Sequence, residues 1–90
     1  MDNKDLEENI VKKQELVRKA LIKQYIEYRK TRNLTQDELA CTMGVKRPNI
    51  SRFETGEYNP TLDLLVKMAE CMNLEIQISL TDKEYDNEEQ

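Results

Sequence analysis

One short stretch of the chain gathers side chains that bind anions and base edges through hydrogen bonds. Between positions 46 and 52 the sequence reads Lys-Arg-Pro-Asn-Ile-Ser-Arg. An arginine fork can read the O6 and N7 acceptors of guanine, and an asparagine amide can pair with adenine or with a phosphate. Arg47 and Arg52 are five positions apart, so both can lie on the solvent side of one helix. The stretch therefore favours recognition of a polyanion over catalysis.

The rest of the composition offers little for catalysis or metal binding. The chain has no histidine, which removes the commonest general base and every Ser-His or Cys-His pair. Its cysteines, Cys41 and Cys71, lie within helical patterns, where a thiol behaves as a small apolar residue. We expect reduced thiols, with a disulfide as the alternative, and we expect no metal, no cofactor and no enzymatic activity.

Charge is distributed unevenly along the chain, although the formal net charge is -4. Residues 9–52 hold eleven Lys or Arg against four acids, whereas residues 53–81 hold one lysine against five acids. Both ends, residues 1–8 and 82–90, are acidic and poor in core-forming residues. The basic half is the part that would face a polyanion, and the ends are expected to be solvated tails.

A chain of 90 residues is long enough for one small domain. No apolar run approaches the ~20 residues of a membrane-spanning helix. The N-terminus lacks the basic start and the apolar core of a secretory signal. We therefore expect a cytoplasmic protein without membrane contact.

Apolar periodicity predicts a long first helix and a short second one. The first runs from about Leu6 to Thr31 without Pro or Gly, and Asn33 can take the left-handed backbone that ends it. The sequence Thr-Gln-Asp-Glu at 35–38 is a capping box that opens the second helix. Gly44 ends that helix in a tight turn.

Two further helices follow. Pro48 suits the first turn of a third helix from about Arg47 to Thr55, in which Ile50 and Phe53 face inward. Thr61 opens the fourth helix. Its predicted apolar face consists of Leu62, Leu65, Met68, Ala69 and Met72.

After the fourth helix the pattern changes to a period of two. Four aliphatic residues alternate there with Glu, Gln and Ser, which is typical of a half-buried strand. These residues are Leu74, Ile76, Ile78 and Leu80. A lone strand leaves its backbone groups unpaired. We expect either disorder or antiparallel pairing with a second copy of the chain, with the four aliphatic residues as dimerisation contacts.

The second and third helices, joined by a turn that contains Gly44, have the pattern of a helix-turn-helix. From Leu34 to Gly56 the chain reads LTQDELACTMGVKRPNISRFETG, and NPTLDLL follows from Asn59. This sequence resembles the Cro and phage-repressor type of DNA-binding domain, the XRE family, from about Ala20 to Leu74. The resemblance implies an all-α, five-helix, lambda-repressor-like fold with an extended N-terminal helix and one C-terminal β-strand. The expected divisions are an acidic tail and helical arm (1–18), the DNA-binding domain (19–74), a dimerisation strand (75–81) and an acidic disordered tail (82–90).

The resemblance also implies roles for individual residues. The positions that would bind DNA are Gln36, Lys46, Arg47, Pro48, Asn49, Arg52, Tyr58 and Asn59. Gln36 would contact a backbone phosphate, and Tyr58 and Asn59 would do the same from the loop after the recognition helix. The alternatives are ordinary surface charges and ordinary turn residues. Arg29 and Glu54 would form a structural ion pair between the first and third helices.

Two positions depart from the family pattern. Lys46 stands where Ser or Thr commonly caps the recognition helix, which weakens the cap but adds a cation for phosphate. Pro48 occupies a position that often carries a base-reading polar side chain. It leaves at most an apolar contact with a thymine methyl group.

The N-terminal part of the first helix carries apolar residues that this domain does not need. They are Leu6, Ile10, Val11, Leu16 and Val17. A helical arm before the domain and a short strand after it resemble HigA-like antitoxins of toxin-antitoxin operons. In such a protein Ile10 and Val17 would anchor the arm to a protein toxin, and the acids of the arm would suit a basic partner. The alternative is that the arm packs on its own domain or on its dimer mate.

The sequence therefore predicts a homodimeric transcriptional repressor that binds double-stranded operator DNA. The resemblance to HigA-like proteins makes it the antitoxin of a HigBA-like operon, with a toxin as a further partner. The alternatives are a stand-alone XRE-type repressor without a toxin, and an interaction scaffold that does not bind DNA.

Overall fold

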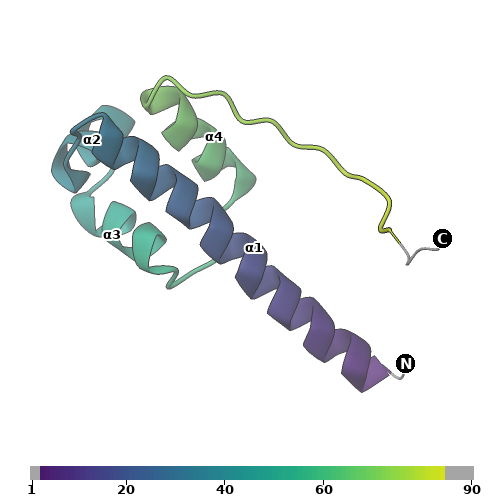
Figure 1. Cartoon of the computed structure of the whole chain (residues 1–90). Coiled ribbons are helices and arrows are strands. Elements are labelled where there is room, and N and C mark those ends of the chain that lie inside the picture. Colours follow the sequence, from purple (N-terminus) through teal and green to yellow (C-terminus); the bar gives the residue numbers. More distant parts are fainter. Residues whose placement is uncertain (1–2, 85–90) are drawn as a thin grey trace.

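The computed structural model describes residues 3–84, which form four helices and an extended C-terminal segment (Figure 1). The helices are α1 (Asn3–Thr31), α2 (Gln36–Met43), α3 (Arg47–Thr55) and α4 (Leu62–Cys71). The three short helices gather around the C-terminal half of α1, and the N-terminal half projects beyond them (Figure 1). The molecule is consequently elongated, with extents of 49 × 28 × 20 Å.

The helix boundaries follow the capping residues of the sequence. The Thr35 hydroxyl accepts a hydrogen bond from the Glu38 amide, and the Glu38 carboxylate accepts one from the Thr35 amide. Gly44 ends α2 with φ 73°, a left-handed conformation that suits a residue without Cβ. Asn33 follows α1 with φ 55°. The predicted spacing of a helix-turn-helix is therefore present in α2 and α3.

A small apolar core lies where the four helices meet. The rings of Tyr25 and Phe53 pack edge to face with their centres 5.4 Å apart, and the Tyr25 hydroxyl donates to the carbonyl of Leu65 at 2.7 Å. Burial raises the pKa of the Tyr25 phenol above its ordinary value of 10.0. The buried set is Ile22, Tyr25, Leu39, Ala40, Met43, Ile50, Phe53, Met68, Ala69 and Met72. Because its first member is Ile22, the N-terminal part of α1 lies outside the core.

The five-helix prediction and the predicted strand are both wrong for the single chain. Residues 3–84 form four helices, because the arm and the first helix of the domain are one continuous helix, α1, and none of residues 72–84 is helical. Within residues 3–84 no strand forms either, since a strand needs a hydrogen-bonded neighbour and the single chain supplies none. The segment is extended and unpaired, and its pairing with a second copy stays a prediction.

Leu62 is a second correction. It was expected on the inward face of α4, yet it is 58% exposed. Leu62 is the first residue of the helix and lies at the margin of the stripe formed by Met68 and Ala69, where few neighbours cover it. Leu64 packs against the core from the opposite margin.

The two cysteines are not joined by a disulfide, as expected. Cys41 is exposed, Cys71 is partly buried, and both are free thiols. The Cys71 thiol lies 3.9 Å from the carbonyl oxygen of Thr42, so it packs beside the end of α2. No helix in residues 3–84 has the length and apolar character needed to span a membrane.

One matched pair of substitutions tests the assignment of the core. Leu39 is 1% exposed and Leu16 is 65% exposed. Leu39→Ala should lower the free energy of unfolding by about 2–5 kcal/mol, because it opens a cavity between the helices. Leu16→Ala should change it by less than about 0.5 kcal/mol. Denaturant unfolding followed by circular dichroism measures both, and equal losses would contradict the assignment of the core.

Candidate nucleic-acid interface

Helix α3 turns two apolar side chains inward and a polar face outward. Ile50 and Phe53 are each 1% exposed and anchor the helix in the core. Arg47 and Arg52 are exposed. Since the two anchors fix the rotation of the helix about its axis, the arginines are held on the solvent side.

The outward face contains a preformed contact between two of the predicted base-reading residues. Arg52 Nη2 donates to Asn49 Oδ1 at 2.6 Å, one helical turn away. This bond uses one of the five guanidinium donors of Arg52. The remaining donors are sufficient for the bidentate pairing of an arginine with guanine.

The loop after α3 closes one side of this face. The Tyr58 hydroxyl donates to the main-chain carbonyl of Asn49 at 3.3 Å, so the ring is held against the helix. Asn49, Arg52, Glu57 and Tyr58 line a shallow cleft of ≈ 520 Å³. Glu57 was not among the predicted residues, although its place beside Tyr58 in the loop was a usable signal. Its carboxylate can accept a hydrogen bond from a cytosine amino group and would repel a phosphate.

The N-terminal end of α3 is less constrained. Arg47 Nε lies 3.8 Å from Asp37 Oδ1, and both side chains are more than half exposed, so this ion pair is weak. Lys46 occupies the N-cap position without a side-chain hydrogen bond, as its residue type predicts. Lys46 and Pro48 are both exposed. Pro48 has no amide hydrogen, and the Asn49 amide donates to the Lys46 carbonyl at 2.9 Å, so the exposed lysine and arginine side chains are the groups at this end that suit a phosphate.

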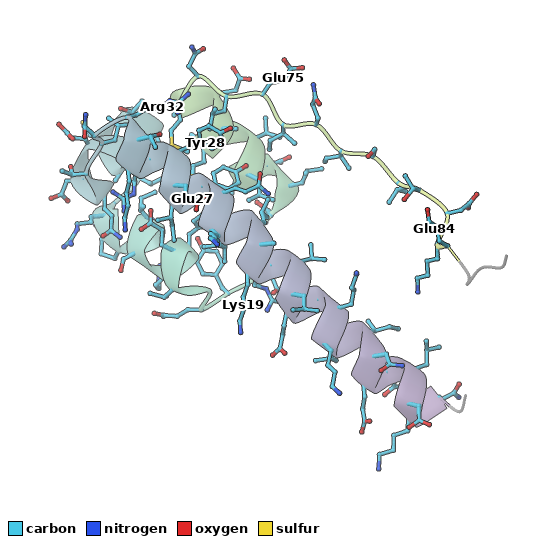
Figure 2. The ribbon with its side chains drawn as sticks, in the orientation of Figure 1. Lys19, Glu27, Tyr28, Arg32, Glu75 and Glu84 are labelled. Atoms are coloured by element: carbon cyan, nitrogen blue, oxygen red, sulfur yellow. The ribbon has the colours of Figure 1, made fainter. Side chains whose placement is uncertain are left out.

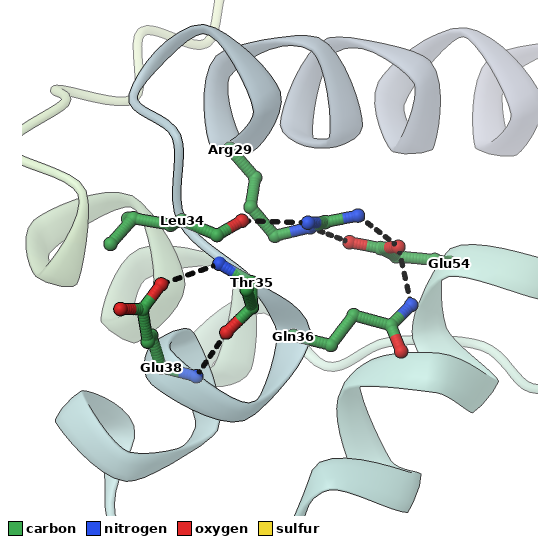
Figure 3. A network of polar contacts seen from close by, with 6 residues as sticks. All are labelled: Arg29, Leu34, Thr35, Gln36, Glu38 and Glu54. Atoms are coloured by element: carbon green, nitrogen blue, oxygen red, sulfur yellow. Dashed lines mark hydrogen bonds and ion pairs between the residues drawn. The ribbon is translucent and has the colours of Figure 1, made fainter.

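A polar network ties α1, α2 and α3 together behind this face (Figure 3). Arg29 Nε and Nη2 donate to the two oxygens of Glu54 at 2.6 and 3.0 Å. Their side chains are only 11% and 10% exposed. Arg29 Nη1 also donates to the carbonyl of Leu34 at 2.7 Å, and Gln36 Nε2 donates to Glu54 Oε1 at 2.8 Å. The ion pair implied by the resemblance is present.

The network gives Gln36 a structural contact in addition to its predicted role. Its amide is engaged with Glu54, so it is a structural contact at the start of α2 as well as a candidate phosphate contact. An amide nitrogen carries two hydrogens, and the second can reach a phosphate. The phosphate role of Gln36 stays a prediction.

The other predicted positions lie away from α3. Asn59 lines a groove beside α1 together with Ile10 and Val17, which are 45% and 56% exposed. Ile78 and Leu80 are 70% and 96% exposed in the extended segment, whereas Leu74 and Ile76 pack against the core. Dimerisation through the aliphatic residues and toxin binding through Ile10 and Val17 stay predictions.

The comparison with known proteins agrees with this geometry. Residues 26–78 match the family model described as Helix-turn-helix. The chain belongs to the helix-turn-helix family. The match includes α2, the turn, α3 and α4, and it excludes most of α1.

Relatives of this helix-turn-helix protein occur in archaea and bacteria. An HTH-type transcriptional regulator of Archaeoglobus fulgidus is 44% identical over 59 residues, which are 64% of this chain and 83% of the relative. One from Methanocaldococcus jannaschii is 42% identical over 56% of this chain and 76% of the relative. Another, from Haemophilus influenzae, is 37% identical over 71% of this chain and 69% of the relative.

One solved structure is similar over nearly the whole chain. It is a chain of a toxin-antitoxin module from Streptococcus pneumoniae, with a TM-score of 0.62 and 26% identity. The similarity covers 91% of this chain and 94% of that chain. It therefore extends beyond the family match into the N-terminal part of α1.

Removal of one partner from the buried network should destabilise the fold. Glu54→Ala leaves the guanidinium of Arg29 nearly buried without a carboxylate, and we expect a loss of about 3 kcal/mol in unfolding free energy. Asp37→Ala removes the partner of the exposed Arg47 pair and should cost less than about 1 kcal/mol. Thermal and denaturant unfolding of both variants measure the difference. A Glu54→Ala protein as stable as Asp37→Ala would contradict the structural role of the network.

Proposed function

We propose that this protein is a sequence-specific transcriptional regulator that places α3 in the major groove of duplex DNA. The observation that supports this function best is the outward face of α3. Asn49 and Arg52 are paired there by a 2.6 Å hydrogen bond while Ile50 and Phe53 hold the helix from behind. The major groove admits an α-helix, and arginine and asparagine can read its base edges. Membership in the helix-turn-helix family supports the same proposal.

The proposed regulator acts as a homodimeric repressor. A two-fold dimer would present two α3 helices to half-sites about 10 base pairs apart, or a multiple of that distance. The unpaired extended segment Leu74–Leu80 supports a dimer, because a second copy can satisfy its backbone groups. Catalysis has no part in this proposal.

Arg52→Ala tests the role of the helix face. We expect a loss of about 1–3 kcal/mol in affinity for the promoter of its own gene, with relaxed specificity at one base position. Lys67→Ala is the matched control, because Lys67 is an exposed cation on α4 rather than on α3. Fluorescence anisotropy at ~150 mM salt, with operator and random duplexes, measures both affinities.

The same measurement can contradict the proposal. Wild-type protein that binds its own promoter no better than random DNA at that salt concentration would show that α3 reads no sequence. Equal losses from Arg52→Ala and Lys67→Ala would indicate a general charge effect instead of a base contact.

A second candidate function is that of an antitoxin in a HigBA-like operon. The likeness to a chain of a toxin-antitoxin module supports this candidate, since it covers the arm as well as the helix-turn-helix. In this case the regulator would also hold a protein toxin, and the adjacent gene would encode it.

Co-expression tests the antitoxin candidate. If it is correct, the tagged protein should co-purify with the product of the adjacent gene and should neutralise that product in growth assays. The variant Arg52→Ala should still neutralise it, because α3 is used for DNA. If the product of the adjacent gene neither binds this protein nor harms growth, the antitoxin candidate is wrong, and the proposal of a DNA-binding regulator is unaffected.

A further inference from the structure

A groove of ≈ 650 Å³ lies along the N-terminal half of α1. Leu6, Ile10 and Val17 line it from the helix, and Pro60 and Leu65 line the end nearest the core. Leu6, Ile10 and Val17 are each about half exposed, at 49%, 45% and 56%. The groove is therefore an apolar surface that the single chain leaves open to water.

The extended C-terminal segment borders the same groove. Lys83 is among the lining residues, so the end of the segment faces α1. Figure 1 shows the segment leaving α4 and running beside the projecting half of α1, and Figure 2 places Glu84 at its described end. Ile78 and Leu80 are 70% and 96% exposed. Since alternate side chains of an extended segment share one face, these two continue the inward face of Leu74 and Ile76 without a surface to cover them.

The charges of the groove indicate what fits it. Its charged lining residues within the described chain are Lys13, Arg18 and Lys83, and no carboxylate is among them. A basic partner would be repelled there. Residues 78–84 carry two acids, Asp82 and Glu84, against one lysine, together with the exposed aliphatic residues Ile78 and Leu80. An apolar, acidic strand is complementary to an apolar groove with basic margins.

We propose that residues 78–84 of a second copy of this chain fill the groove. The strand from the second copy lies antiparallel to the extended segment of the first, on the side that faces α1. Its Ile78 and Leu80 cover Leu6 and Ile10, and its Asp82 and Glu84 approach Lys13 and Arg18, because two residues of an extended strand span about the same length as four residues of a helix. Each copy gives a strand and accepts one, as a two-fold interface requires.

This inference rests on the homodimer of the proposed function and specifies where the two copies meet. It favours the account in which the arm packs within the dimer over the account in which it holds a toxin. The first copy cannot fill the groove with its own segment in the observed conformation, because that segment forms the opposite margin and leaves Leu80 almost fully exposed.

Cross-linking between two differently substituted copies tests the contact. Full-length protein with Cys41→Ser and Cys71→Ser supplies a background without cysteine. One preparation then carries Ile10→Cys and the other carries Leu80→Cys. After mixing, subunit exchange and mild oxidation, we expect a covalent heterodimer on a non-reducing gel, because a disulfide forms only between nearby Cβ atoms. Leu16→Cys mixed with Leu80→Cys is the control, since Leu16 is exposed on α1 but does not line the groove. It should cross-link at least tenfold less.

Sedimentation gives an independent measurement. Val17→Asp should raise the dimer dissociation constant at least tenfold, whereas Val11→Asp should leave it within about twofold, because Val11 is exposed outside the groove. Circular dichroism should show both variants folded, since neither residue belongs to the core.

Three results would overturn the inference. The first is a dimer that persists without the cross-link. The second is a disulfide within one chain that carries both Ile10→Cys and Leu80→Cys, formed in an excess of cysteine-free copies. The third is a groove whose residues are shielded from solvent only when the adjacent gene product is present. Operator binding is measured separately. A missing cross-link with intact operator binding removes this inference alone, and a cross-linked dimer without sequence-specific binding removes the proposed function alone.

Discussion

The nearly buried ion pair between Arg29 and Glu54 constrains the rest of the structure. Two charged side chains with about a tenth of their surface exposed are stable only when each satisfies the other, so their relative position is strongly fixed. Arg29 lies near the end of α1 and Glu54 near the end of α3, and the guanidinium also reaches the carbonyl that precedes α2. A helix of nine residues is too short to be stable or oriented by itself. The direction in which α3 points therefore depends on this contact together with the burial of Ile50 and Phe53.

One face of α3 carries the residues that stabilise the fold, and the opposite face carries the residues proposed for recognition. Its inward residues are shared with the core, whereas Arg47 and Arg52 contribute exposed charge and Asn49 an amide. In the proposed regulator, substitutions on the outward face would therefore alter DNA preference without a large cost in stability. The hydrogen bond between Arg52 and Asn49 and the contact of Tyr58 with the Asn49 carbonyl restrict the side chains before DNA arrives. Such preorganisation lowers the entropy lost on binding.

Features that depend on neighbouring residues were predictable from the sequence. The capping box of Thr35 and Glu38 and the turn at Gly44 need no information beyond four positions. The Arg29–Glu54 pair spans 25 positions, and only the family resemblance pointed to it.

Leu62 was misplaced because periodicity gives the angle of a residue around a helix but not how far the neighbouring helices extend. The fifth helix came from the resemblance, whereas the stretch from Leu6 to Thr31 contains no Pro or Gly and forms part of one unbroken helix. The strand needs a partner that the single chain does not contain, so its sequence pattern could be read correctly while the element itself does not form. The residue type of Glu57 gave no signal, because a carboxylate is repelled by the phosphates that dominate DNA binding.

In the proposed homodimer, the continuity of α1 would connect the arm to the orientation of α3. The 29 residues of α1 make a helix about 43 Å long, and it continues without interruption across the boundary expected near position 18. The arm is therefore rigidly joined to Arg29, and through Glu54 to α3. A second copy seated against the arm would fix the distance and angle between two recognition helices. A flexible linker in the same place would let that distance vary and would weaken the preference for one spacing of half-sites. In the proposed dimer a continuous helix would connect the interface between the two copies to the spacing of the two recognition helices, and the interface would cover apolar residues of the arm that the helix-turn-helix domain alone does not need.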